Sequence, residues 1–223
     1  MNDLRFAFRQ LWKSSGFTAV AVLTLALGIG ACTAIFSLVD TVLLRPLPYP
    51  EPERVVLVQQ EFKGSQAIPF SWPNFEDVAH DNHSFAALAI VQRGDATLSG
   101  SGPAEKVRGA LVSSDFFRVL GVHTVVGRPF TKEEDRTGAD KVAVIRASLW
   151  QRKFGGTTEA LGKIVTLDGE QYTIVGVLPN DTITPSNCEF WIPIKPFANS
   201  AAYAPVWQKR GNQPGFFGYG RLK

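Results

Sequence analysis

Residues 17–39 read FTAVAVLTLALGIGACTAIFSLV, and no charged residue occurs between positions 14 and 39. A helix over this stretch rises about 1.5 Å per residue and reaches about 34 Å, enough to cross a hydrocarbon core of roughly 30 Å. No second stretch in the sequence holds the roughly 18 consecutive apolar residues that a crossing needs. The sequence therefore predicts one transmembrane helix, which we place with its flanks at residues 16–45.

Two kinds of signal peptide are the alternatives for this stretch. A cleaved secretory signal has an apolar core of about 7–15 residues, which is shorter than the present one. A lipoprotein signal would place its modified cysteine at Cys32, but residues 33–39 continue as an apolar run where a lipoprotein usually has a polar tether. An uncleaved membrane anchor is therefore favoured.

The segment at residues 1–15 predicts a short amphipathic helix that lies in the cytoplasmic membrane interface. Its apolar side chains fall on one helical face, at Leu4, Phe8, Leu11 and Trp12. An ordinary positively charged flank is the alternative. Basic residues outnumber acids before the span, and such residues favour the cytoplasmic side. We therefore expect a cytoplasmic N-terminus and an extracytoplasmic location for residues 46–223.

Small residues in the apolar stretch predict that the helix packs against a second membrane helix. Ala26, Gly30 and Ala34 form one row at intervals of four, and Gly28 belongs to a second row. Such rows let two helix backbones approach closely. Alanine and glycine are also common in any membrane helix, so the sequence leaves both interpretations open.

A proline-rich segment, RPLPYPEPER, follows at residues 45–54. Proline cannot continue a helix, and it disfavours helix at the residue before it. Arg45, Pro46, Pro48 and Pro50 therefore predict a stiff, extended joint where the chain leaves the membrane. We take the helix and this joint as the mechanical parts of the protein.

Residues 46–223 show alternating strand and helix signals. The expected strands lie at residues 55–58, 85–90, 95–98, 105–111, 141–145, 163–167, 172–178, 190–192 and 216–222. One expected helix opens at Ser71, two others lie at residues 113–121 and 147–154, and residues 197–218 read as a loop. Most aromatic residues on these elements are expected in the core, with a peptide-binding surface as the alternative. The conspicuous ones are Phe116, Phe117, Trp150, Phe154, Tyr172, Phe190 and Trp191.

The composition excludes several classes of protein. With 45% hydrophobic and 19% charged residues, the chain is neither disordered nor a collagen-like repeat. Its net charge of +3 includes no run of five or six like charges, so no nucleic-acid partner is expected. Two cysteines are too few for a disulfide framework.

No catalytic, cofactor or metal site is expected. The sequence contains neither the phosphate-binding string GxxxxGK[ST] nor the nucleophile motif GxSxG. His80 and His83 are spaced as HxxH, but no third ligand of suitable spacing follows. A solvated helix face is the favoured interpretation of this pair.

Taken in order, these segments resemble the permease subunits of MacB/FtsX-type ABC transporters, especially the large permease branch abundant in acidobacteria. The resemblance covers almost the whole chain, and the order and spacing of its motifs make it specific. The motifs are LTLALGIGACTAIFSLVD at 23–40, LLRPLPYPEPERVV at 43–56, SWPNFEDV at 71–78, VSSDFFRVLGVHTVVGRPF at 112–130, LWQRKFGG at 149–156 and LDGEQYTIVGVLP at 167–179.

The resemblance implies an α+β fold in which one N-terminal transmembrane helix precedes an extracytoplasmic, mixed α/β, porter-like half-module. Residues 46–111 would form the first half of that module and residues 112–196 a β-rich inserted subdomain. Residues 197–223 would form a loop and the start of the return strand. Family members continue through the rest of the domain and three further helices, so we expect this chain to be truncated at its C-terminus.

The resemblance also implies a function, that of a non-catalytic permease component in the bacterial inner membrane. In the family, two permease copies work with a separate ATPase subunit. Cytoplasmic ATP hydrolysis then moves the extracytoplasmic domain for export or efflux. The expected partners are thus the lipid bilayer, an ABC ATPase and a second permease copy. The alternative is a stand-alone, single-pass anchored module that binds an extracytoplasmic partner.

Overall fold

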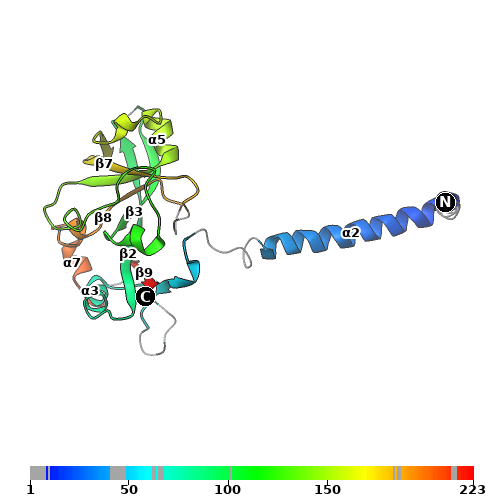
Figure 1. Cartoon of the computed structure of the whole chain (residues 1–223), viewed down its shortest axis with the longest axis horizontal. Coiled ribbons are helices and arrows are strands. Elements are labelled where there is room, and N and C mark those ends of the chain that lie inside the picture. The colour runs from blue at the N-terminus through cyan, green and yellow to red at the C-terminus, as the bar shows by residue number, and fades with distance from the viewer. Residues whose placement is uncertain are drawn as a thin grey trace. The chain divides into compact units, whose positions relative to one another are not determined.

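The computed structural model describes residues 9, 11–40, 49–61, 64, 68–100, 102–182, 184, 187–211 and 215–223. The chain divides into two compact units, Met1–Leu47 and Pro48–Lys223. Figure 1 shows the long helix α2 of the first unit and the strands and short helices of the second. The two units are described separately below.

The first unit is built around one helix, α2, at Ser15–Val39. It begins after a turn at Ser14, and the backbone N–H of Asp40 closes its end by donating to the carbonyls of Phe36 and Ser37. None of its residues is buried. Within the described residues it is the one helix that is long and apolar enough to cross a membrane. Residues 41–45, which the sequence assigned to the same helix, lie outside the described residues.

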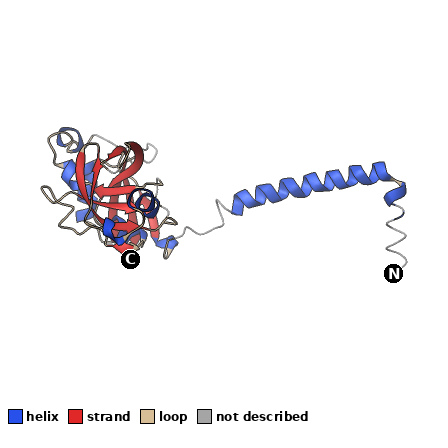
Figure 2. Ribbon diagram, turned by 90° about the horizontal axis from the view of Figure 1, so that it is seen from above, coloured by secondary structure: helices blue, strands red, loops and turns tan. Residues whose placement is uncertain are grey.

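The second unit contains one mixed sheet of nine strands in the order β1-β9-β2-β3-β8-β5-β7-β4, with β6 pairing both β2 and β7 (Figure 2). The strands are β1 Val55–Val58, β2 Phe85–Ser99, β3 Glu105–Val112, β4 Val126–Gly127, β5 Val142–Arg146, β6 Ile164–Leu167, β7 Glu170–Leu178, β8 Phe190–Pro193 and β9 Phe217–Leu222.

The long strand β2 holds the sheet together, because it pairs with three other strands. It lies antiparallel to β3 over eight residue pairs, to β9 along its first half and to β6 at its last two residues. The last strand, β9, lies between β1 and β2. A side chain in place of Gly220 would lie 2.5 Å from the ring of Phe85, so the close approach of these elements requires glycine there.

Short helices flank the strands at α3 Trp72–His80, α4 Phe116–Leu120, α5 Ala147–Phe154, α6 Lys195–Ala198 and α7 Ala204–Trp207, with 3-10 turns η2 at Pro52–Arg54 and η3 at Thr158–Ala160. The helices expected from Ser71 and at 147–154 are confirmed. The expected loop at residues 197–218 was wrong in part, because it contains α7, which is held in place by the buried side chain of Trp207.

The core has three clusters, and the large aromatic side chains fill all of them. Phe116, Phe117 and Trp191 pack edge to face in the first, and Phe190 lies in the second. The third contains Phe70, Trp72, Phe75, Trp207 and Phe216. The expectation that the aromatic residues build the core is therefore confirmed for most of them. Trp150 and Phe154 are only partly buried at the margin of the second cluster.

The predicted boundary between residues 111 and 112 falls within a continuous sheet. Strand β3 continues to Val112 and pairs with both β2 and β8. Pro48–Lys223 forms one compact unit. The finer division at 46–111, 112–196 and 197–223 stays a prediction.

Candidate functional site

The first candidate region is the surface of α2. Ala26, Gly28, Gly30 and Ala34 are all exposed, and no atom lies within 4 Å of the position that a Cβ would take on either glycine. Ala26, Gly30 and Ala34 follow one another at intervals of four and so share a helical face, while Gly28 lies on another. The backbone of this face is open to close approach by a second helix.

Two threonine side chains of α2 form their hydrogen bonds within the helix itself. The hydroxyl of Thr24 donates to the carbonyl of Val20 at 2.9 Å, and the hydroxyl of Thr33 donates to the carbonyl of Ile29 at 2.7 Å. Neither hydroxyl therefore requires water, which is the condition for placing such a residue in lipid.

The N-terminal segment joins α2 through a fixed turn. Leu11, Trp12 and Lys13 are helical, Ser14 forms the turn, and the hydroxyl of Thr18 donates to the carbonyl of Leu11 at 2.8 Å. The indole of Trp12 is 82% exposed, as expected for a side chain that contacts lipid headgroups. Leu4 and Phe8 of the same predicted face lie outside the described residues.

The predicted membrane-exit joint is described only at its end. Arg45, Pro46 and Pro48 lie outside the described residues. Pro50 is the last of the four, and its carbonyl accepts a hydrogen bond from the Arg221 guanidinium at 2.9 Å. Arg221 lies on β9, so the end of the joint is attached to an inner strand of the sheet.

Two arginines hold this attachment, which we call the arginine clamp (Arg54 and Arg221). Arg54 donates two hydrogen bonds to the carbonyl of Leu222, at 3.1 and 2.8 Å. Arg221 also donates to the carbonyl of Val119 at the end of α4, at 2.9 Å. Both guanidinium groups lie within 3.5 Å of a Glu51 carboxylate oxygen. The clamp therefore ties residues 50–54 to β9 and α4.

Sequence reasoning missed the clamp. The two arginines are separated by more than 160 positions, and four of their five hydrogen bonds are accepted by backbone carbonyls, which carry no signature in a sequence. Only the antiparallel pairing of β1 with β9, which places Val55 opposite Arg221, brings the two guanidinium groups together.

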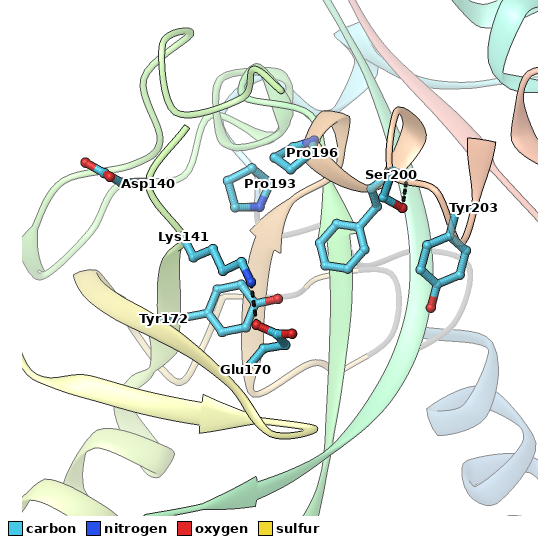
Figure 3. Close-up of a pocket in the computed structure, with 9 residues that line it drawn as sticks. Asp140, Lys141, Glu170, Tyr172, Pro193, Pro196, Ser200 and Tyr203 are labelled. Carbon is cyan, nitrogen blue, oxygen red and sulfur yellow. Dashed lines mark hydrogen bonds and ion pairs between the residues drawn. The ribbon is translucent and has the colours of Figure 1, made fainter. Parts of the chain in front are cut away.

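A second candidate region is a hollow of about 220 Å³ in the sheet unit. In Figure 3, Lys141, Glu170 and Tyr172 lie on one side of it and Pro196, Ser200 and Tyr203 on the other. Lys141 and Glu170 form an ion pair. Burial, with the nearby carboxylates of Glu170 and Asp168, raises the pKa of the Tyr172 hydroxyl to about 12, so this hydroxyl stays protonated at physiological pH.

Asp135 forms a buried contact between two distant loops. One carboxylate oxygen accepts the backbone N–H of Ser114 at 2.9 Å, and the other accepts that of Lys195 at 3.0 Å. Burial raises the pKa of this carboxyl group, while the two N–H donors oppose the rise. Asp135 thus holds the chain just after β3 against the chain just after β8.

The histidine pair shows no metal-binding geometry. The ring of His80 contacts the carboxylate of its neighbour Asp81 at 2.9 Å, and both side chains are exposed. In the part of the chain that the structure describes, no three His, Cys, Asp or Glu side chains are grouped closely enough to hold a metal ion.

Comparison with known families gives one match that covers most of the chain. The family described as the MacB-like periplasmic core domain matches residues 18–215, a range that starts inside α2 and ends just before β9. Among curated proteins, the macrolide export ATP-binding/permease protein MacB of Hahella chejuensis is 33% identical over 66 residues. That segment is 30% of this chain and only 10% of the relative.

Solved structures share the fold at low sequence identity. The periplasmic region of MacB from Actinobacillus actinomycetemcomitans superposes with a TM-score of 0.55 at 14% identity, covering 76% of this chain and 74% of that one. A permease-protein domain from Porphyromonas gingivalis gives 0.59 at 16%, covering 78% and 77%. The extracellular domain of the ABC-type transporter YknZ from Gram-positive bacteria gives 0.50 at 16%, covering 76% and 82%.

Proposed function

Because the chain belongs to the family of the MacB-like periplasmic core domain, we propose that it is a non-catalytic permease component of an ABC transporter. In this proposal, a separate ATPase subunit hydrolyses ATP in the cytoplasm, and the permease passes the resulting movement to its extracytoplasmic unit for export or efflux. The single observation that carries the proposal is the range of the family match, which includes both the apolar helix and the sheet unit.

The helix α2 would cross the bacterial inner membrane with its N-terminus in the cytoplasm. Basic residues before the span support this orientation, and the internally bonded threonine hydroxyls support the location in lipid. Residues 46–223 would then be extracytoplasmic. The row of Ala26, Gly30 and Ala34, with Gly28 on a neighbouring face, would receive a second membrane helix, from another permease copy or from the same assembly.

The arginine clamp supplies a physical route for the movement. Residues 45–50 would form the stiff joint between the membrane and the sheet. A displacement of α2 along its axis would act on Pro50 and Glu51, and from there on β9 and α4 through Arg221. Hydrogen bonds between a charged donor and a carbonyl are directional and short, so they suit the transmission of a small displacement.

Orientation is tested with reporters fused after Lys223. Alkaline phosphatase, which is active only outside the cytoplasm, is expected to be active in this fusion, while green fluorescent protein exported by the same route is expected to stay dark. The reverse pattern would contradict the proposed topology.

Coupling is tested with the full chain in lipid nanodiscs and the ABC ATPase subunit encoded nearest to it. We expect the two to associate and the chain to change the rate of ATP hydrolysis. Replacement of Gly30 by leucine is expected to weaken the assembly. The control, Leu25→Ile, alters no small residue and is expected to leave the assembly intact. A stable, folded chain that associates with no ATPase would favour the anchored, partner-binding module instead.

A further inference from the structure

One stretch of the central strand β2 has an open edge. β3 covers one side of β2 from Val91 to Leu98. On the other side, β9 pairs only as far as Val91, and β6 pairs only from Leu98 onward. Between them, at residues 94–96, no strand among the described residues lies along this edge.

The direction of the backbone groups at this gap follows from Thr97. Its N–H donates to the Asp168 carboxylate at 2.8 Å, and its C=O accepts the Asp168 N–H at 3.0 Å, so both groups of Thr97 point towards β6. Backbone groups of alternate residues in an antiparallel strand point to the same edge. The N–H and C=O of Asp95, two residues earlier, therefore point into the gap.

The gap opens into a groove. A hollow of about 490 Å³ lies along it, with Gly94, Asp95 and Ala96 among its lining residues. This hollow shares Glu170, Tyr172, Phe197 and Tyr203 with the neighbouring hollow of about 220 Å³ (Figure 3). The two hollows therefore adjoin, and we call them together the groove.

Aromatic side chains form the apolar wall of this groove. The ring of Tyr203 packs against Phe197 at 5.9 Å and against Trp207 at 5.1 Å between ring centroids. Trp207 is buried, so it fixes the position of the Tyr203 ring, which is itself 44% exposed. A rigid, exposed aromatic ring beside a charged rim is a favourable contact for an alkyl-ammonium or guanidinium group.

The charges of the groove select the occupant. Four carboxylates line the two hollows, at Asp95, Asp140, Asp168 and Glu170, against the two cations Arg93 and Lys141. Lys141 is already paired with Glu170, and Arg93 lies over the ring of Phe217 at 5.4 Å. Lys106 approaches Asp95 only at 3.8 Å, where both side chains are exposed. Each such pair neutralises one carboxylate together with one cation, so the excess of negative charge that an entering segment meets is that of four carboxylates over the three cations Arg93, Lys106 and Lys141.

We propose that this groove binds a basic, extended peptide segment of an extracytoplasmic partner, which adds to β2 as a short strand between β9 and β6. Its backbone would bond to the N–H and C=O of Asp95, and its lysine or arginine side chains would lie against Tyr203 and the carboxylates of Asp95 and Glu170. Strand addition supplies affinity through the backbone, and the groove supplies preference for side chains. The proposal goes beyond the permease function and does not depend on an ATPase.

The probe is a fluorescein-labelled octapeptide of alternating arginine and valine, added to the full chain in phosphatidylcholine nanodiscs. Fluorescence anisotropy is expected to rise to saturation with the chain and to stay flat with empty nanodiscs. A peptide with citrulline in place of arginine keeps the shape but not the charge, and we expect it to bind about tenfold more weakly or worse. A peptide N-methylated at every residue keeps the charge but has no backbone N–H on either edge with which to pair as a strand, and it should lose binding to a similar extent.

Two variants of the chain locate the binding. Glu170→Gln and Tyr203→Ala are each expected to weaken binding severalfold, while Tyr203→Phe, which keeps the ring, should bind as the unaltered chain does. Glu76→Gln is the matched control, because it removes an exposed carboxylate on α3, outside the groove. Circular dichroism of each variant confirms that the fold is retained.

Three results would overturn the proposal: equal binding of the arginine and citrulline peptides, equal binding of the N-methylated peptide, or equal binding to the groove variants and the control. The second result would indicate electrostatic contact without strand addition. Because no ATPase or nucleotide is present, a negative result leaves the coupling proposal untouched.

Discussion

The helix α2 and the sheet unit are stabilised in opposite ways. In α2, the hydroxyls of Thr24 and Thr33 bond to carbonyls three or four residues back, that of Thr18 bonds no further away than Leu11, and none of the helix residues is buried. In the sheet unit, β1 pairs with a strand more than 160 positions away, and buried aromatic rings from many elements share each core cluster. The helix depends on its surroundings for stability, whereas the sheet unit depends on contacts between distant parts of its own chain.

The largest expected effect is on the unfolding free energy of the sheet unit, when a tryptophan is removed from the sheet unit rather than from the first unit. Trp191→Ala deletes a fully buried ring that packs against Phe117 and carries the Arg146 guanidinium at 5.6 Å. Loss of such a ring costs about 3–5 kcal/mol in unfolding free energy. Trp12→Ala deletes an 82% exposed ring of the first unit and should leave the sheet unit unchanged. Denaturant titration of the full chain in micelles, followed by circular dichroism in the β region, compares the two; equal midpoints would contradict the described core.

A charged residue placed within α2 tests whether this helix depends on a lipid environment. Leu27→Lys places an ammonium group near the middle of Ser15–Val39, which costs about 2.5–3.5 kcal/mol for membrane insertion. We expect a smaller membrane-bound fraction, measured after alkaline extraction of membranes. Phe17→Lys is the control, because a lysine near the helix end reaches the headgroups and costs little. Equal extraction of both variants would indicate that α2 does not span the bilayer.

Removal of one arginine of the arginine clamp is expected to lower the stability of the sheet unit by an intermediate amount. Arg221→Ala removes the hydrogen bonds to the carbonyls of Pro50 and Val119, and a loss of about 1–3 kcal/mol is expected. Amide hydrogen exchange should rise at residues 50–58. Arg136→Ala, whose guanidinium contacts Glu133 only at the surface, should change stability by less than about 0.5 kcal/mol. If both variants exchange alike, residues 50–54 are not held by Arg221.

The smallest expected effect is the loss of stability of the sheet unit at alkaline pH. Burial raises the pKa of Tyr49 and of Tyr172 to about 12, from the ordinary value of 10.0. Above pH 10 the unfolded chain loses these protons first, so the stability of the sheet unit should fall as pH rises from 10 to about 12. Denaturant midpoints measured at several pH values in this window give the slope of stability against pH.

Tyr172→Phe is the matched variant for that measurement. It removes one of the titrating hydroxyls, so its midpoint should decline less steeply than that of the unaltered chain. The helix α2 contains no tyrosine, and its helical signal should not change over the same range. A slope that is unaffected by the substitution would mean that the pKa of Tyr172 is the same in the folded and the unfolded chain.

Local patterns in the sequence identified most elements of the fold. The strand at 55–58, the helix at 147–154 and the hairpin around Asp168 and Gly169 are all found where the sequence placed them, since turn chemistry and residue periodicity are local signals. The helix α7 was missed, because Pro205 and the surrounding small residues give no helical signal and only the burial of Trp207 fixes it.

The candidate sites also divide into one that the sequence shows and two that it does not. The small-residue row of α2 is read directly from intervals of four, although what packs on it stays a prediction. The arginine clamp and the groove had no sequence signal, since they combine Arg54 with Arg221 and Asp95 with Tyr203. Among the aromatic residues considered as a peptide-binding surface, Tyr172 and Phe190 line the groove, while Phe116, Phe117 and Trp191 are core residues.

The sequence by itself determined that one segment is apolar enough to cross a membrane, that a mixed α/β unit follows it, and which family the motifs resemble. These properties depend on residues close together in the chain. Only the tertiary structure decided that β9 lies between β1 and β2, that Arg221 reaches the carbonyl of Pro50, and that no strand within the described residues pairs with β2 at Asp95 on the side of β9 and β6. Each of these contacts involves a backbone group on at least one side, and because every residue carries the same backbone, no residue pattern records which of them will meet.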